Sequence, residues 1–333
     1  MMKIATYNTY GPPEVVRIEE VAKPVPANNE VLIKIYASTI SAGDWRARSL
    51  EMPAGFGMLG RLVFGVFGPR NKILGTELSG VIEAVGSDVT QFAVGDAVIA
   101  YTENGCHAEY RTVPEDSAIV PKPESLSFEQ GAALSFGGVT ALDFLQEYGE
   151  ISTGETVLVN GASGSVGSAC VQLAKHFGAI VTGVSSKKNH DLLGALGADF
   201  VIDYAQEDFT SGHKVYDIVV DCVGNAPWDQ SKRVLSKTGR LLLVAGSLSD
   251  MLRASFVSKK HGKKLVSGVS MGNRDKLVGL MKIVEAGAFM PVIDRVYPLQ
   301  DIVDAHAYVD SGRKCGNVVI SMVPPLQLSH AAE

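Results

Sequence analysis

Apolar and polar residues alternate in short runs over the first third of the chain. Glycine and proline separate these runs, as at 11–13 (Gly-Pro-Pro) and 94–96 (Val-Gly-Asp), and such residues usually mark turns between strands. Residues 1–125 are therefore expected to form a mostly β, barrel-like unit with few helices, and its strands are expected at 2–7, 31–37, 80–85, 97–101 and 108–113.

The pattern changes near residue 126, where apolar strands begin to alternate with helical stretches of about 10 to 15 residues. This alternation is typical of an α/β unit with a doubly wound parallel sheet. Short-strand character returns after residue 293, so the segments expected are 1–125, 126–293, and a tail, 294–333, that folds back onto the first unit. The later strands are expected at 156–160, 180–184, 200–202, 218–222, 241–245, 265–269 and 318–322.

The composition is that of a mildly acidic globular protein that dissolves in water. The 333 residues are 46% apolar and 20% charged, with a formal net charge of −6. No apolar run is long enough to span a bilayer, and the first residues lack the apolar core of a secretory signal. We expect neither an integral membrane protein nor a nucleic-acid binder, because the one basic run is short: Lys259, Lys260, Lys263 and Lys264.

The number and spacing of the cysteines indicate the cellular compartment. A disulfide framework would need more cysteines at closer spacing, and widely separated cysteines fit a reducing environment. We therefore expect a cytoplasmic protein with four unpaired cysteines: Cys106, Cys170, Cys222 and Cys315.

The strongest chemical signal is a glycine-rich turn between a predicted strand and a predicted helix. The strand at 156–160 runs into Gly161-Ala-Ser163-Gly164-Ser-Val-Gly167, and a helix closed by Gly178 follows. In such turns the early glycines let backbone N–H groups approach a pyrophosphate, and the last glycine lets the helix pack on the strand. Together with the second strand at 180–184, this arrangement predicts a dinucleotide site.

The residues after that second strand indicate which dinucleotide binds. An NAD enzyme usually has a carboxylate about 20 residues after the loop, where it accepts a hydrogen bond from the ribose 2′-hydroxyl. This chain has Ser185-Ser186-Lys187-Lys188 instead, and no carboxylate occurs before Asp191. Hydroxyl and ammonium groups suit a 2′-phosphate, so we predict NADPH rather than NADH. The alternative is a solvated lysine pair that begins the next helix.

Short-chain dehydrogenases carry a similar glycine turn, but the sequence does not fit that class. Their catalytic Tyr-x-x-x-Lys pair is absent, because none of the ten tyrosines has a lysine four residues later. Their glycine turn also lies near the N-terminus, whereas this one follows 160 residues.

Other motifs accompany the glycine loop: 41–46 (SAGDWR), 75–86 (GTELSGVIEAVG), 94–98 (VGDAV), 105–110 (GCHAEY), 137–141 (GGVTA), 196–199 (LGAD), 201–204 (VIDY) and 316–320 (GNVVI). Together they resemble the medium-chain dehydrogenase/reductase superfamily, and within it the zinc-free quinone oxidoreductase branch that includes zeta-crystallin-like and alkenal/one oxidoreductase-like proteins. The similarity covers nearly the whole chain. It implies a GroES-like β domain completed by the tail, a Rossmann domain, and an active site in the cleft between them.

The same resemblance argues against a metal. Zinc alcohol dehydrogenases of the superfamily carry Gly-His-Glu where this chain has Gly-Thr-Glu at 75–77, and Cys-His where it has Gly-Asp at 43–44. A catalytic zinc needs three protein ligands. Cys106 and His107 are neighbours on an extended segment and would point to opposite faces, so we expect no metal site.

Without a metal to stabilise an alkoxide, the easier reaction is hydride transfer from the nicotinamide to a quinone or to the β-carbon of an α,β-unsaturated carbonyl. The protein then has to orient the cofactor and place a donor where negative charge develops. The resemblance puts Asp44, Trp45 and Arg46 beside the nicotinamide. Arg46 is the candidate donor to the carbonyl oxygen or a cofactor ribose, and Trp45 would shape the cleft. A structural Asp44–Arg46 interaction is the alternative.

The resemblance also implies a set of cofactor contacts. These are Thr140 near the nicotinamide end, Ser165 and Val166 at the pyrophosphate, Ser186, Lys188 and Tyr204 at the 2′-phosphate, Cys222 and Val223 under the adenosine, and Ala245, Gly246 and Ser247 at the nicotinamide.

Two further segments have an expected role. The glycine- and hydrophobe-rich insert at 52–69 is expected to be a flexible loop that covers a hydrophobic substrate, with a partner surface as the alternative. The strand at 265–269 lies at a sheet edge in this superfamily and commonly pairs with its twin, so we expect a homodimer.

The sequence therefore favours an NADPH-dependent, zinc-independent oxidoreductase that acts on a small hydrophobic quinone or carbonyl compound. Two alternatives stay open, because fold alone does not decide function. One is a nucleotide-binding sensor or interaction protein without significant turnover. The other is an enoyl-thioester reductase, which would share the cleft.

Overall fold

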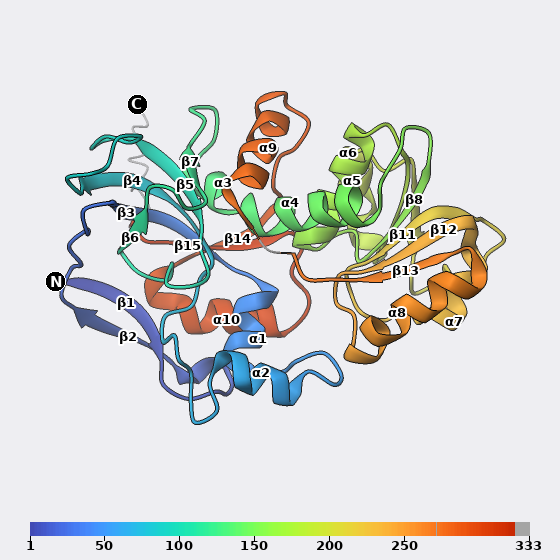
Figure 1. Ribbon diagram of the computed structural model, residues 1–333, viewed down its shortest axis with the longest axis horizontal. Coiled ribbons are helices and arrows are strands. Elements are labelled where there is room, and N and C mark those ends of the chain that lie inside the picture. The colour runs from blue at the N-terminus through green and yellow to red at the C-terminus, as the bar shows by residue number, and fades with distance from the viewer. Residues whose placement is uncertain (271, 324–333) are drawn as a thin grey trace, which may run out of the picture.

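Two large β-sheets organise the computed structural model, which describes residues 1–270 and 272–323 (Figure 1). One sheet is built from the N-terminal segment and the tail, and the other from the segment between them. The predicted end of the tail, 324–333, lies outside the described residues.

The first sheet has seven strands in the order β14-β15-β3-β4-β5-β7, with β6 paired to β3. The tail strand β15 runs antiparallel to β3, with Val319 opposite Thr39, so the expected return of the tail to the first unit is confirmed. The strands are β3 (Glu30–Ile40), β4 (Glu77–Val85), β5 (Ala97–Tyr101), β6 (Tyr110–Pro114), β7 (Ile119–Pro121), β14 (Ile293–Pro298) and β15 (Asn317–Ser321).

A separate hairpin of β1 (Met2–Tyr7) and β2 (Val16–Val21) flanks this sheet. The strand β2 was not predicted. Its sequence, VRIEEV, buries only Val16, so the alternation that identifies a half-buried strand is missing.

The second sheet has six parallel strands in the order β10-β9-β8-β11-β12-β13, which confirms the α/β class and the doubly wound parallel sheet. The direction of winding reverses between β8 and β11, and ligands of such sheets bind at that point. The strands are β8 (Thr156–Asn160), β9 (Ile180–Ser185), β10 (Phe200–Asp203), β11 (Tyr216–Asp221), β12 (Leu235–Leu243) and β13 (Lys264–Ser267).

Both faces of this sheet are buried, as continuous apolar strands require. On β8, Val157 and Val159 join one hydrophobic core and Leu158 joins the other. In Figure 1, α4, α5 and α9 lie on one side of the sheet and α7 and α8 on the other. The helices of this unit are α4 (Ser135–Leu142), α5 (Ser165–His176), α6 (His190–Ala195), α7 (Trp228–Ser231), α8 (Leu248–His261) and α9 (Arg274–Glu285).

The expected strand at 241–245 is displaced in the structure. It begins at Leu235 and ends at Leu243, because the pairing of β12 with β11 shifts register between Tyr216 and Ile218 and thereby includes an extra polar stretch. Residues 244 and 245 leave the strand and enter a loop.

Four helices of the described chain accompany the first sheet: α1 (Ala42–Ser49), α2 (Gly57–Phe64), α3 (Phe128–Ala132) and α10 (Ile302–Asp310). The guanidinium of Arg48 is buried and donates to both carboxylate oxygens of Asp310, at 2.6 and 2.5 Å, so it ties α1 to α10. The insert at 52–69 was expected to be a loop, and this was wrong, since α2 lies within it.

Short helical turns complete the chain: η1 (Pro13–Val15), η2 (Asp143–Tyr148), η3 (Lys187–Asn189), η4 (Lys232–Val234) and η5 (Leu299–Asp301). Among the described residues, no helix has the length and hydropathy that crossing a bilayer requires.

Candidate functional site

Two adjoining cavities lie where the parallel sheet reverses its winding. The glycine-loop cavity, about 710 Å³, is bordered by the turn after β8, the end of β9 and residues 312–314. The α1 cavity, about 490 Å³, is bordered by α1, residues 51–54 and the loops after β11 and β12. Val223 borders both. The two cavities therefore share part of their wall.

The glycine loop has the geometry that the sequence predicts. Gly161 has φ +77°, and a Cβ there would lie 2.6 Å from Val223 Cγ2. A Cβ on Gly167 would lie 2.1 Å from the carbonyl oxygen of Gly161, so only glycine permits this packing of helix on turn. A Cβ on Gly164 would lie 3.5 Å from the carbonyl oxygen of Gly161, at ordinary van der Waals distance. No side chain caps α5, which leaves amides of its first turn available to an anion.

The tail fixes this loop in place. The amide of Gly316 donates to the carbonyl of Ser163 (2.8 Å), and the Ser165 hydroxyl donates to the side-chain oxygen of Asn317 (2.6 Å). Residues 150 positions apart in the chain thus share the site, and Ser163, Ser165 and Val166 all border the cavity.

The end of β9 forms the far wall of the glycine-loop cavity. Ser185, Ser186, Lys188 and Tyr204, the residues predicted at the 2′-phosphate, all border it. Ser185 is buried and its hydroxyl donates to the carbonyl of Ser186 (3.1 Å), whereas Tyr204 is largely exposed. Glu207 and Asp208 also border this region.

Two cations that border the glycine-loop cavity were not predicted from the sequence. Arg313 and Lys314 precede β15 and border the same cavity. The Lys314 ammonium donates to the carbonyl of Gly316 (2.8 Å), and burial lowers the pKa of Lys314 to about 8. The signal was present, because only Cys315 separates the two residues from the Gly316-Asn317 motif.

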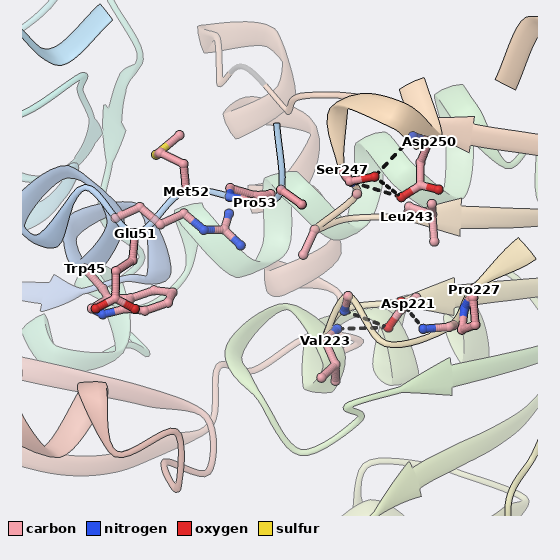
Figure 2. Close-up of a pocket in the computed structure, with 16 residues that line it drawn as sticks. Trp45, Glu51, Met52, Pro53, Asp221, Val223, Pro227, Leu243, Ser247 and Asp250 are labelled. Carbon is pink, nitrogen blue, oxygen red and sulfur yellow. Dashed lines mark hydrogen bonds between the residues drawn. The ribbon is translucent and has the colours of Figure 1, made fainter. Parts of the chain in front are cut away.

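The α1 cavity brings Trp45 and Arg46 close to the loops of the parallel sheet. In Figure 2, Trp45 and Glu51 lie on one side of the cavity, and Asp221, Leu243 and Asp250 lie on the other. Arg46 is half-buried, and this burial lowers its pKa, although a guanidinium stays protonated in proteins. Arg46 is thus a cation within a partly apolar cavity.

Asp44 is placed differently from the expectation. It is buried, its Oδ1 accepts from the amide of Gly75 (2.7 Å), and its Oδ2 accepts from the amide (2.8 Å) and hydroxyl (2.6 Å) of Ser41. It therefore caps α1 and holds the neighbouring chain, and in the described structure it bonds to these residues instead of Arg46. Within the described ranges, neither Asp44 nor Thr140 borders either cavity.

Asp221 is the main residue of the site that sequence reasoning did not find. It ends β11, is fully buried, and accepts from the amides of Val223 (3.0 Å), Gly224 (3.1 Å) and Ala226 (3.0 Å) and from the side-chain amide of Asn160 (2.9 Å). Figure 2 shows the bonds to this loop. A lone aspartate after an apolar strand was the available signal. Asp221 shapes the loop that both cavities share.

The loop after β12 brings Ala245, Gly246 and Ser247 to the α1 cavity. A Cβ on Gly246 would lie 2.3 Å from the hydroxyl of Ser267. Ser247 caps α8, since its hydroxyl accepts from the amide of Asp250 (3.2 Å) and the Asp250 carboxylate accepts from Ser247.

Cys222 borders the glycine-loop cavity, as predicted. Its contact with the Cys170 thiol and its burial raise the pKa of Cys222 well above the usual range. The group therefore stays a neutral thiol, which packs as a small apolar residue and does not act as a nucleophile.

The side chains do not assemble a metal site in the part of the chain that the structure covers, where no group of three or more His, Cys, Asp or Glu residues could hold an ion. The Nε2 atom of His107 lies 2.9 Å from the carbonyl of Thr39. Glu77 is fully buried, accepts from the Thr39 hydroxyl and from the amide of Phe136 (2.7 Å), and burial raises its pKa to about 7. These donors hold the protein backbone and do not fit a zinc site.

Known proteins resemble the chain along most of its length. Residues 27–124 match the alcohol dehydrogenase GroES-like domain and residues 196–320 match the family described as zinc-binding dehydrogenase. The chain is 33% identical to 2-methylene-furan-3-one reductase of Solanum lycopersicum, over 97% of this chain and 80% of that protein. It is 30% identical to quinone oxidoreductase of Mus musculus, over 96% and 98%. The structure of the quinone oxidoreductase from Coxiella burnetii superposes with a TM-score of 0.84 at 31% identity, over 97% and 99%.

Proposed function

Because the chain belongs to the medium-chain dehydrogenase/reductase superfamily, in its quinone oxidoreductase-like branch, we propose that it is an NADPH-dependent, zinc-independent reductase of quinones or α,β-unsaturated carbonyl compounds. The observation that carries this proposal is the pair of cavities that meet at Val223, with the glycine loop at one end and Arg46 at the other.

The glycine-loop cavity has the features that a nicotinamide dinucleotide requires. The turn at 161–167 and the uncapped start of α5 would hold the pyrophosphate, with Arg313 and Lys314 supplying positive charge. Cys222 and Val223 would lie under the adenosine. Ala245, Gly246 and Ser247 then border the α1 cavity, where the nicotinamide belongs. Asp44 and Thr140, which border neither cavity, would act as positioning residues.

The preference for NADPH over NADH rests on charge. The wall formed by Ser186 and Lys188 has no carboxylate at the position where an NAD enzyme accepts from the ribose 2′-hydroxyl. Lys188 and the hydroxyls can donate to a 2′-phosphate. Glu207 and Asp208 lower this preference, but the Asp208 carboxylate is engaged by the Thr210 amide (2.9 Å) and hydroxyl (2.8 Å).

The α1 cavity supplies what the substrate needs. When bound, the dihydronicotinamide supplies a hydride to an electrophilic carbon. Arg46 would donate to the oxygen that gains negative charge, which a partly desolvated cation stabilises better than water does. Trp45, Met52 and Pro53 give the cavity an apolar wall that fits a small hydrophobic substrate. Water would supply the proton.

The donors that are present support zinc independence. One matching family is described as zinc-binding, but Thr76 stands where its zinc members have a histidine, and Glu77 and His107 are engaged by backbone groups and a hydroxyl. Three protein ligands are needed for a catalytic zinc, and these residues do not provide them.

We also propose a homodimer in the cytoplasm. The strand β13 lies at the edge of the six-stranded sheet, where pairing with a second copy would satisfy its free backbone groups. The domain limits at residues 125 and 293 stay predictions. Light scattering tests the dimer, and a monomer mass would refute it.

The function is tested with the purified full chain by measuring NADPH and NADH oxidation side by side with a panel of quinones, enals and enones. The proposal predicts turnover with NADPH and at least one of these substrates. Binding of NADPH without any turnover would instead support a sensor protein. Turnover of crotonyl-CoA but not of free enones would support an enoyl-thioester reductase.

A further inference from the structure

The insert that contains α2 exposes an unusual amount of apolar surface. We name residues 57–72 the α2 surface. Phe67 is fully exposed, Met58 is 81% exposed, and the other bulky side chains are exposed by about half: Leu59, Leu62, Val63 and Val66. Contiguous apolar surface of this kind usually marks an interaction site.

These apolar side chains are not needed to hold the segment in place. Gly60 is the only buried residue of α2, and it packs against Met52. The Tyr10 hydroxyl donates to the carbonyl of Gly65 (2.9 Å), which fixes the end of the helix. The helix therefore keeps its position through small residues and backbone contacts, and its bulky side chains stay free for another surface.

The lid expected of the insert stays a prediction, and of the insert's described residues only the first, 52–54, border the α1 cavity. Within the described residues, the α1 cavity is bordered by 51–54, which precede α2, and no residue of α2 borders either cavity. Figure 1 shows α2 at the lower edge of the molecule, outside both large sheets.

The charges in and around the α2 surface indicate a partner with negative charge. Residues 52–76 contain three basic residues, Arg61, Arg70 and Lys72, and no acidic residue, although the whole chain has a net charge of −6. All three side chains are exposed, and within residues 1–270 and 272–323 none forms an ion pair. Apolar side chains beside unpaired cations are the pattern of a segment that lies in the interface of an anionic bilayer.

We propose that the α2 surface docks the protein onto a lipid bilayer that carries anionic headgroups. Met58, Leu62 and Phe67 would enter the boundary between headgroups and acyl chains, and Arg61, Arg70 and Lys72 would contact the headgroups. The apolar contribution grows with the area buried, and the charged contribution is weakened by salt.

The α2 surface follows closely, along the chain, the residues that border the α1 cavity. Residues 51–54 border that cavity and lead directly into α2, and the amide of Leu248 donates to the carbonyl of Ala54 (3.0 Å). Docking would place this cavity near the bilayer. If the proposed function holds, on which this second step rests, the substrates include lipophilic quinones or enones that are dissolved in the membrane.

The test is co-sedimentation of the full chain with vesicles of phosphatidylcholine alone or with about a third phosphatidylglycerol. The proposal predicts binding to the anionic vesicles that weakens with salt, and about ten-fold weaker binding for Met58→Ser/Phe67→Ser. Val25→Ser/Val94→Ser is the matched control, because both valines are exposed elsewhere, and it should bind like wild type. Arg61→Gln/Arg70→Gln/Lys72→Gln should lose the preference for anionic vesicles.

Several results would overturn the proposal. One is that the wild type stays in the supernatant with anionic vesicles. Another is that the Met58→Ser/Phe67→Ser variant and its control bind equally. A third is loss of self-association in the Met58→Ser/Phe67→Ser variant without vesicle binding by wild type, which would make the surface an interface between copies of this chain.

This assay needs no turnover, so it separates docking from the proposed function. In a second arm, oxidation of NADPH by a long-chain quinone held in anionic vesicles should fall about ten-fold in Met58→Ser/Phe67→Ser. Turnover of a short, water-soluble quinone should stay at the wild-type rate. Equal loss with both quinones would refute delivery from the membrane.

Discussion

The glycine-loop cavity and the α1 cavity meet at Val223 but are built in different ways. The first is formed largely by backbone: a turn that only glycine can form at 161 and 167, and a helix start without a side-chain cap. The second is formed by side chains from distant segments, with Trp45 and Arg46 facing the loop that Asp221 organises. In this comparison, the backbone groups of the turn and the helix start determine where an anionic ligand binds. The side chains of the α1 cavity determine which reaction follows.

The largest expected effect follows from Gly167→Ala, which breaks the backbone-built cavity. Its Cβ would lie 2.1 Å from the Gly161 carbonyl oxygen, so the turn must shift. We expect a loss of about 1 to 3 kcal/mol in stability and, if the same strain acts on the bound cofactor, a loss of up to about 100-fold in NADPH affinity. Thermal unfolding and fluorescence titration measure the two quantities.

Gly164→Ala is the matched control for the stability measurement, since its Cβ would have 3.5 Å of space. It should unfold like wild type. Any loss of cofactor affinity in this variant then reports how closely the cofactor approaches the turn, and not a change in stability. A Gly167→Ala variant with wild-type stability and affinity would contradict the role given to this turn.

The second effect concerns the cavity built from side chains. Arg46→Gln removes a charged donor, and hydrogen bonds from charged groups contribute about 1.5 to 3 kcal/mol. We therefore expect kcat/KM for a quinone to fall by about 30-fold, while the dissociation constant for NADPH changes little. Arg46→Lys should retain part of the activity. An equal loss in cofactor binding would remove the distinction between the two cavities.

A smaller effect is expected at the wall of the glycine-loop cavity. Lys188 borders the cavity and Lys187 does not. Because Lys188 is exposed, its interaction with a 2′-phosphate is screened by water, and Lys188→Ala should reduce the preference for NADPH over NADH by about five-fold. Lys187→Ala should leave the preference unchanged. If the two variants behave alike, the lysine pair is only a solvated surface.

The smallest effect is a pH dependence carried by Lys314. Burial lowers its pKa to about 8, so its ammonium is charged below that pH and becomes neutral above it. NADPH affinity should therefore weaken by about three-fold as the pH rises through 8. Lys314→Met should bind more weakly below pH 8 and lose this pH step. A step that persists in the variant would assign the titration to another group.

Local patterns predicted much of the backbone-built region. The strand at 156–160, the turn at 161–167 and the helix closed by Gly178 are encoded within about 20 consecutive residues, so their periodicity and glycine spacing were sufficient. Gly178 indeed has φ +80°. The six-stranded parallel sheet followed from the same alternation of strands and helices.

Contacts between distant residues could not be predicted in this way. Ser165 meets Asn317 across 152 positions, and Asp221 meets Asn160 across 61, and no local pattern encodes such pairs. Asp44 was predicted at the cleft because the resemblance places its segment beside the nicotinamide. One residue on a helix turns the side chain by about 100°, and in the structure Asp44 completes the capping box of α1. The helix α2 was not predicted, because the insert contains many glycines and glycine disfavours helices.

We propose that this chain reduces a quinone or enone with NADPH and without a metal. The test is the rate of NADPH oxidation with the preferred substrate before and after chelation, with the metal content of the same sample determined. We expect an unchanged kcat in protein that contains less than stoichiometric zinc. Loss of activity on chelation, with recovery when Zn²⁺ is added back, would contradict it.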